Sequence, residues 1–192
     1  MKKLLFNPFE KYDGRPILVL GLLATVIGSA LGYAFNARFD GVLDMHFVDS
    51  ANYVEPFTDN VFNIAALFAA LYIAGYMINK KTRPIDILGT VMLARLPFYF
   101  DTLTNINGYM NEFGKKILEA GPNLQNLDPV DLWLPALLGL LTLPLLIWYI
   151  ALLYNGFKTA TNLKTTQHKW SFALALIAAE ILSKITFYLL YS

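Results

Sequence analysis

Cysteine is absent from the 192 residues of this chain, and histidine occurs only twice. Without cysteine there is no disulfide bond, no thiolate metal site and no cysteine nucleophile. Charged residues make up only 15% of the chain, and none lies in 16–37, 60–79 or 132–157. Because 56% of the residues are hydrophobic, the composition differs from that of a typical soluble domain.

The three uncharged stretches are long enough to cross a membrane. A helix rises 1.5 Å per residue, so about 20 residues span roughly 30 Å of hydrocarbon. The sequence therefore predicts membrane-spanning helices at 16–36, 60–79 and 133–157. Two further apolar segments, 84–100 and 170–191, contain charged residues and are also predicted to span. The expected fold is an all-α bundle of five transmembrane helices, one membrane domain over 1–192 with outer loops at 37–59 and 101–132.

The distribution of basic residues supports five crossings, because cytoplasmic loops are enriched in Lys and Arg. With a cytoplasmic N-terminus, the inner segments hold ten basic residues: Lys2, Lys3, Lys11, Arg15, Lys80, Lys81, Arg83, Lys158, Lys164 and Lys169. The outer segments hold three, which are Arg38, Lys115 and Lys116. If 84–100 did not span, the basic loop 158–169 would lie outside. The N-terminus is therefore predicted to be cytoplasmic and the C-terminus to be outside.

The N-terminal segment differs from a cleaved signal peptide, because Glu10 and Asp13 precede the first apolar run and no A-x-A site follows it. We therefore expect an integral multi-pass protein, located in the cell (inner) membrane if the source is bacterial. The net charge of +1 gives no indication of nucleic-acid binding.

Three predicted spans carry small residues at four-residue intervals, a pattern that lets membrane helices approach closely. These residues are Ala24, Gly28 and Gly32, then Ala66, Ala70 and Ala74, and finally Ala175, Ala179 and Ser183. The pattern predicts the faces through which these helices pack in a compact bundle.

The two outer loops have different patterns. Apolar and polar residues alternate along FDGVLDMHFVDS, which predicts a half-buried strand or an extended flap. Asp44, His46 and Asp49, with Asp40, are weak candidates for divalent-metal ligands. A solvated loop explains the same residues, so neither a metal nor a cofactor is predicted. The second outer loop predicts a short amphipathic helix that ends at Gly121.

Motifs of catalysis are missing from the sequence. It contains neither a serine-centred G-x-S-x-G elbow nor an H-E-x-x-H zinc motif. In the predicted topology, His46 and His168 lie on opposite sides of the membrane and cannot share a site. The sequence therefore predicts a protein without enzymatic activity.

Arg95 and Glu180 are charged residues inside predicted spans, where an ion costs at least a few kcal/mol and normally faces a partner. Arg95 lies ten residues from Ile85, and Glu180 lies ten from Trp170. At the helical rise, both are about 15 Å deep from the inner side. The equal depths predict a buried bidentate ion pair that determines which helices pack together. The alternative is a proton or ion relay that uses Glu180.

Lys184 and Asp101 lie closer to the outer side. Counted in the same way, they are about 21 Å and about 24 Å from the inner ends of their spans. Their similar depths predict a second pair, and the alternative is that Lys184 snorkels outward to the membrane surface. Lys184 is also one helical turn from Glu180 on the same predicted helix.

Two stretches of the chain resemble a known family. RPIDILGTVMLARLPFYF and LLTLPLLIWYIALLYNGFKTATNLKTTQHKWSFALALIAAEILSKI are similar to the third to fifth membrane segments of the Yip-one family of Ypt-interacting multi-pass proteins, in its bacterial branch. The resemblance implies a five-helix Yip membrane domain with a cytoplasmic N-terminus and no catalytic residues.

For the eukaryotic members, the resemblance also implies binding of prenylated Rab-type GTPases and a role in vesicle formation. This chain has the 15 residues MKKLLFNPFEKYDGR where those members have a long cytosolic tail, and it lacks their D-L-Y-G-P signature. Binding of a small GTPase is therefore not expected.

The expected function is that of a scaffold or of a membrane-organising, trafficking-type interaction protein. Its expected partners are the lipid bilayer and other membrane proteins or a second copy of the chain. The alternative is a small transporter or channel component that uses Arg95 and Glu180. A scaffold should have a dry, packed interior, whereas a transporter should have a cavity that reaches these residues from one side.

Overall fold

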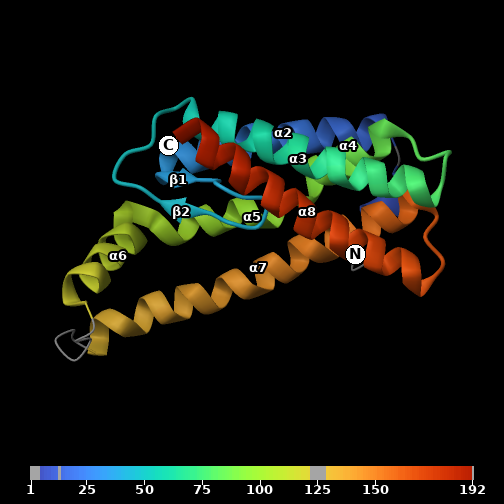
Figure 1. The fold of residues 1–192 in the computed structure, drawn as a ribbon. Helices are drawn as coiled ribbons and strands as arrows, with labels where there is room; N and C mark the ends of the chain where they lie inside the picture. Colours follow the sequence, from blue (N-terminus) through green and yellow to red (C-terminus); the bar gives the residue numbers. More distant parts are fainter. Residues whose placement is uncertain (1–4, 13, 122–128, 192) are drawn as a thin grey trace.

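The computed structural model of the protein describes residues 5–12, 14–121 and 129–191. The fold is all-α, with one two-stranded hairpin (Figure 1). In chain order, the elements are η1 (Pro8–Glu10), α2 (Arg15–Ala34), β1 (Ala37–Arg38), β2 (His46–Phe47), α3 (Glu55–Ile78), α4 (Pro84–Ala94), α5 (Leu96–Phe100), η2 (Asp101–Gly108), α6 (Tyr109–Ala120), α7 (Pro129–Thr161) and α8 (Thr166–Tyr191). Lys2, Lys3, Asp13 and the part of the predicted outer loop at 122–128 lie outside the described residues.

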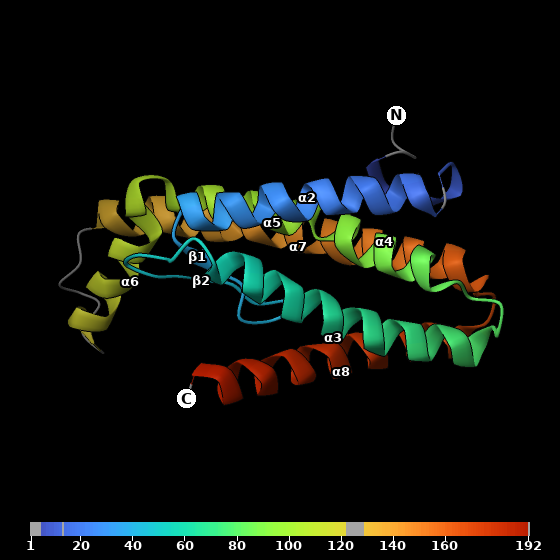
Figure 2. The same ribbon diagram turned by 90° about the horizontal axis from the view of Figure 1, so that it is seen from above.

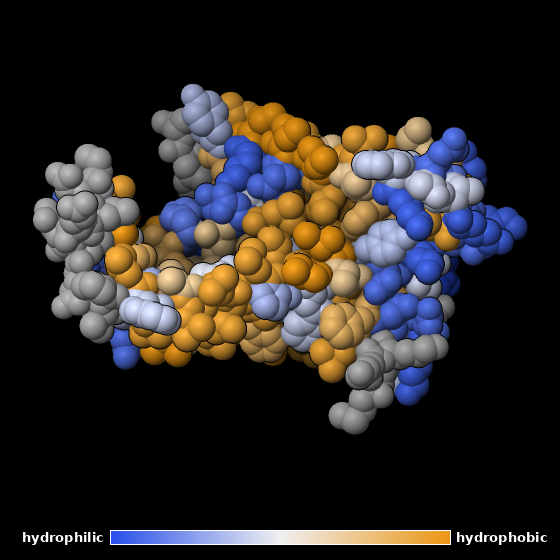
Figure 3. Space-filling model, turned by 90° about the horizontal axis from the view of Figure 1, so that it is seen from below, coloured by the Kyte–Doolittle hydropathy of each residue, from blue (hydrophilic) through white to orange (hydrophobic). Residues whose placement is uncertain are grey.

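Figure 2 shows the long helices running lengthwise, with the start of α2 and the end of α8 at opposite ends of the bundle, and Figure 1 shows α7 and α8 inclined in opposite directions. The start of α2 and the turns at 79–83 and 162–165 form one end, which we call the inner end. The hairpin, α6 and the end of α8 form the other end, which we call the outer end. The described basic residues of the predicted cytoplasmic side therefore gather at the inner end, where Figure 3 shows a mostly hydrophilic surface.

In the part of the chain that the structure describes, four helices are long and apolar enough to cross a membrane, namely Arg15–Ala34, Glu55–Ile78, Leu132–Thr161 and Thr166–Leu190. They correspond to four of the five predicted spans. Their outward-facing side chains are large and apolar, and Figure 3 shows hydrophobic surface along the flanks of the bundle. A soluble monomer rarely exposes a continuous apolar surface of this kind. These features support a membrane location.

The remaining predicted span, 84–100, which is the third in chain order, is divided into α4 and α5 at Arg95. Pro97 explains the break, because proline lacks an N–H and its ring clashes with the carbonyl group four residues earlier. The segment packs against α2, α3 and α7, and most of its side chains are buried. Because α4 and α5 face protein on several sides, a charged residue here is shielded from lipid.

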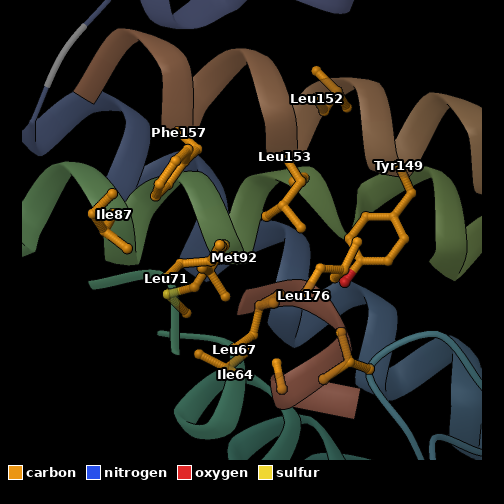
Figure 4. Packing of buried hydrophobic residues seen from close by; sticks show 14 of the residues in the cluster. Ile64, Leu67, Leu71, Ile87, Met92, Tyr149, Leu152, Leu153, Phe157 and Leu176 are labelled. Carbon is orange, nitrogen blue, oxygen red and sulfur yellow. The ribbon is translucent and has the colours of Figure 1, made fainter. Parts of the chain in front are cut away.

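Apolar side chains fill the inner half of the bundle. Figure 4 shows Leu67, Leu71, Ile87, Leu153 and Phe157 pointing into the space between α3, α4 and α7, and each of them is 0% exposed. Close-packed contacts of this kind stabilise helix association where both the protein interior and the surrounding lipid are apolar.

Two of the three small-residue patterns mark contact faces as predicted. On α2, a Cβ atom added to Gly28 would lie 2.2 Å from the Tyr99 ring, so only glycine permits this approach. On α8, Ala179 and Ser183 are fully buried. On α3, Ala66, Ala70 and Ala74 are half-buried, and Ala70 and Ala74 pack against the edge of the core, so this pattern marks the rim of the contact face. The buried face of α3 instead includes Asn60, Asn63, Leu67, Leu71 and Gly75.

The outer loops largely follow their predicted patterns. Between residues 43 and 47, half-buried and exposed side chains alternate, as expected for a half-buried strand. The hairpin itself pairs only Ala37 with Phe47 and Arg38 with His46. The predicted amphipathic helix is α6, and it ends at Gly121, whose φ of 56° suits glycine. Helix α3 begins at Glu55, five residues before the predicted start of the second span.

Candidate functional site

Arg95 is fully buried at the junction of α4 and α5. Its Nε donates a hydrogen bond to Asn60 Oδ1 (3.2 Å), and its Nη1 donates to the backbone carbonyl oxygen of Val42 (3.2 Å). The guanidinium carbon also lies 5.4–5.8 Å from the ring centroids of three aromatic residues, which are Phe39, Phe98 and Tyr99. Aromatic faces attract a delocalised cation, so the charge is buried among neutral groups that each stabilise it.

Asn60 connects this arginine to three helices. Its side-chain Nδ2 donates to Ser29 Oγ of α2 (2.9 Å) and to the carbonyl oxygen of Pro56 within α3 (3.0 Å). Its Oδ1 accepts from the Tyr99 hydroxyl of α5 (3.1 Å) as well as from Arg95. The amide therefore uses both its donor and its acceptor in a buried setting, where unsatisfied polar groups are costly.

Residues 38–43 form a loop that enters the outer half of the bundle, and we call it the inserted loop. At its start, the Arg38 guanidinium binds the Asp59 carboxylate through Nε (2.7 Å) and Nη2 (3.0 Å). Asp59 Oδ2 also accepts from the Phe39 N–H (3.1 Å), and Asn63 Nδ2 donates to the Phe39 carbonyl oxygen. The buried polar residues at the start of α3 therefore bind the backbone on both sides of Phe39.

Helix α8 holds the other side of the inserted loop. Glu180 Oε2 accepts from the N–H of Leu43 (2.8 Å), and Ser183 Oγ accepts from the N–H of Val42 (3.2 Å). A Cβ atom added to Gly41 would lie 2.7 Å from Glu180 Oε1, so glycine allows the carboxylate to come this close. A carboxylate that accepts from backbone N–H groups forms a strong, charge-assisted hydrogen bond.

Arg95 and Glu180 come together at the inserted loop, but the direct bidentate pair predicted from their depths is not what the described structure shows. Arg95 binds the carbonyl oxygen of Val42, whereas Glu180 binds the N–H of the next residue, Leu43. The two charges therefore lie on opposite sides of one peptide unit. Depth counting gives the height of a side chain along the bundle, and it could not show that a loop lies between the two helices.

Lys184 and Asp101 also differ from their predicted pairing. The Lys184 ammonium group binds the Asp44 carboxylate and lies 3.6 Å from Asp40 Oδ2. It therefore reaches the outer loop, as a lysine that extends outward would. Asp101 is 8% exposed, and its carboxylate makes no hydrogen bond or ion pair with the part of the chain that the structure describes. Burial raises the pKa of Asp101 to about 6.

The weak metal candidates each bind a different partner. Asp44 binds Lys184, and Asp49 binds Lys115 and Asn111. His46 Nδ1 lies 3.1 Å from Asp40 Oδ1, and the interaction with the Asp40 carboxylate raises the pKa of His46. Within residues 5–12, 14–121 and 129–191, no three His, Asp or Glu side chains are grouped so that they could hold a metal ion.

Several residues of the site escaped sequence reasoning. Asn60 and Asn63 belong to the predicted span at 60–79 and Asp59 directly precedes it, so hydropathy gives none of the three a separate role. Two asparagines three residues apart in an otherwise apolar helix are a usable signal, because residues with this spacing share a helix face. That signal could have identified a polar contact face at the start of α3.

We call Arg95, Asn60, Asn63 and the side chains that contact them the Arg95 cluster. The buried polar atoms in or beside it that have no hydrogen bond to the described residues include Arg95 Nη2, Asn63 Oδ1 and Tyr149 Oη. Tyr149 lies within electrostatic range of both Arg95 and Glu180. Its ring also stacks on Phe98, with 5.8 Å between the ring centroids. The cluster therefore extends from α3 and α4 to α7.

A cavity of about 730 Å³ lies at the outer end, beside the cluster. Phe98 and Leu43 line it, and both also contact the cluster, since Phe98 faces the Arg95 guanidinium and Leu43 binds Glu180. Arg95, Asn60 and Glu180 themselves do not line this cavity.

Comparison of the chain with protein-family models, with curated proteins and with solved structures finds no match. The similarity to the Yip-one family therefore stays a prediction.

Proposed function

We propose that this protein is a non-enzymatic, multi-pass membrane scaffold or membrane-organising protein, whose helices are locked by the inserted loop. The observation that carries the proposal is the burial of the Arg95 cluster. The side chains of Arg95, Asn60 and Asn63 are all 0% exposed. Arg95 contacts a backbone carbonyl, an amide and aromatic rings, and these neutral partners favour a structural role.

The proposal includes five crossings, with α4 and α5 together as the third crossing, a cytoplasmic N-terminus and an outer C-terminus. The position of the two chain ends at opposite ends of the bundle supports an odd number of crossings. The basic residues at the inner end support the orientation. The similarity to the Yip-one family is consistent with this topology, and the proposed scaffold role does not require binding of a small GTPase.

Labelling of single cysteines tests the topology, because the chain has no cysteine of its own. Lys81→Cys and Lys164→Cys lie in exposed inner turns, and Asn52→Cys and Glu112→Cys lie at the exposed outer end. A membrane-impermeant maleimide should label only the outer pair in intact cells, and all four after permeabilisation. Labelling of Lys164→Cys in intact cells would contradict five crossings.

The alternative function is a small transporter or channel component. The observation in its favour is the cavity at the outer end, from which Phe98 and Leu43 separate the Arg95 cluster. Purified protein in proteoliposomes loaded with a pH-sensitive dye distinguishes the two. A scaffold should give no ion or proton flux above protein-free vesicles, and it should co-purify with a reproducible set of proteins from native membranes. A flux that disappears in Glu180→Gln would favour the transporter.

A further inference from the structure

The cavity at the outer end has an apolar wall and one buried acid. It lies between the hairpin loop, α5, η2, α6 and α7, and Figure 3 shows a hollow in the surface on this side of the bundle. Its volume of about 730 Å³ is in the range of small-molecule sites. Much of its wall is formed by Met45, Phe98, Met110, Phe113 and Leu146. Methionine and aromatic side chains of this kind adapt to irregular apolar ligands.

Asp101 is the charged side chain of the cavity lining that has no partner among the described residues. The residue is 8% exposed, and its carboxylate has no hydrogen bond or ion pair with the described residues. The other ionisable residues of the lining are paired: Asp44 with Lys184, His46 with Asp40, and Lys115 with Asp49. A buried carboxylate without a partner is costly, so a cationic group beside it would be stabilised.

We propose that this cavity binds an amphiphilic amine, with the ammonium group on the Asp101 carboxylate and the apolar part against the methionine and phenylalanine wall. An anion is disfavoured, because the unpaired charge is negative and the lysine of the lining is already bound by Asp49. A metal ion is disfavoured, because a single carboxylate provides too few oxygen ligands. The ammonium group donates to the carboxylate in a charge-assisted hydrogen bond, and the phenylalanine rings also attract a cation.

Protonation of Asp101 should control the affinity. Burial raises its pKa to about 6, and a bound ammonium group favours the ionised carboxylate. Binding should therefore weaken as the pH falls below about 6, by up to about tenfold per pH unit. Asp44, His46 and Lys115 are the other ionisable groups that line the cavity, so the same pH series on Asp101→Asn separates their contribution.

Binding of dodecylamine to the purified full-length protein in a non-ionic detergent tests the proposal. Dodecanol and dodecanoate are matched probes that differ only in the head group. Dodecylamine should raise the melting temperature in a saturable manner, with an apparent affinity about tenfold or more above that of dodecanol, as a charge-assisted hydrogen bond implies. Asp101→Asn should remove this preference, whereas Glu119→Gln, at an exposed acid of α6 outside the lining, should retain it.

Two glycines provide a steric control. Gly114 lines the cavity and Gly139 does not, and a Cβ atom at either position would meet no atom within 4 Å. Gly114→Leu should therefore fill the cavity and weaken dodecylamine binding, whereas Gly139→Leu should bind as the wild type does. Equal shifts by dodecylamine and dodecanol, or unchanged binding by Asp101→Asn, would overturn the proposal.

The ammonium group could be supplied by a free amine or by the head group of an aminophospholipid. Nanodiscs that contain phosphatidylethanolamine or phosphatidylglycerol distinguish these sources. If the lipid is the source, phosphatidylethanolamine should compete with dodecylamine at the cavity, and this competition should disappear in Asp101→Asn. If the amine is free, both lipids should leave dodecylamine binding unchanged.

Discussion

The inner and outer halves of the bundle are held together in different ways. In the inner half, apolar side chains such as Leu71, Val91 and Phe157 fill the space between helices and are fully buried. In the outer half, buried polar residues such as Arg95, Asn60 and Asp59 hydrogen-bond to one another and to the backbone of the inserted loop. Apolar contacts have little directional preference, whereas hydrogen bonds do. The inner half therefore determines which helices are close, and the outer half determines where one loop lies.

Removal of Arg95 should destabilise the outer half of the bundle more than any other single change. Arg95→Ala removes the donor to the Val42 carbonyl oxygen and leaves a cavity between three aromatic rings. The loss of a buried, hydrogen-bonded ion should lower the free energy of unfolding by about 3–5 kcal/mol. Titration with SDS in mixed micelles, followed by circular dichroism, measures this change. Arg15→Ala, at an exposed inner position, should change stability by less than about 0.5 kcal/mol.

Reversal of both charges distinguishes a direct Arg95–Glu180 pair from two separate contacts with the inserted loop. In Arg95→Glu with Glu180→Arg, a carboxylate would face the Val42 carbonyl oxygen and a guanidinium would face the Leu43 N–H. Both contacts would be repulsive, so the double variant should be no more stable than the less stable single variant. Recovery of stability in the double variant would show a direct Arg95–Glu180 pair and contradict the role of the inserted loop.

Asp101 tests whether a buried carboxylate destabilises the outer half of the bundle. Its pKa rises from 3.8 to about 6 on burial, so its ionisation destabilises the folded state as the pH rises through that range. The raised pKa corresponds to at most about 2–3 kcal/mol at pH 7 and above, because solvent screens part of the charge. Asp101→Asn should therefore be more stable than the wild type by up to this amount at pH 7, and equally stable near pH 4. A difference that is independent of pH would contradict burial of the ionised group.

The main lines of the fold could be predicted from the sequence. Apolar length and charge spacing locate the candidate spans, and an amphipathic pattern with a terminal glycine locates α6. These signals are local, because they depend on helical rise and on residues near one another in the chain. The span at 84–100 is harder to recognise, since Arg95 and Pro97 interrupt it and protein surrounds it on several sides.

The site was less predictable than the fold. The sequence gives Arg95 and Glu180 the same depth in the predicted bundle. It could not place Val42 and Leu43 between them. Whether a loop enters the bundle depends on contacts between residues that are far apart in the chain. Asn63 and Phe39 are one such contact, and Ser183 and Val42 are another. Hydropathy averages the asparagine with its apolar neighbours and does not reveal that its amide binds a backbone carbonyl.

Gly156 tests the packing of the inner half. A Cβ atom at this position would lie 2.3 Å from Thr90 Cγ2, so α7 and α4 approach through glycine. Gly156→Ala should therefore cost about 1–2 kcal/mol through overpacking, measured by the same SDS titration. Gly139→Ala on the same helix has open space and should be neutral or slightly stabilising. Adding Thr90→Ala to Gly156→Ala should recover part of the loss, since it removes two of the clashing atoms.

Glu180 gives the smallest expected change and separates a structural contact from a relay. Glu180→Gln keeps an oxygen that can accept the Leu43 N–H and loses only the charge, so it should cost about 1 kcal/mol or less. Glu180→Ala removes the acceptor, and it should cost more and increase hydrogen exchange of the Leu43 amide. A relay requires a carboxyl group that binds and releases protons, so a relay would be impaired by glutamine as much as by alanine. If the two variants are equally destabilised and exchange equally fast, the hydrogen bond to Leu43 does not hold the inserted loop.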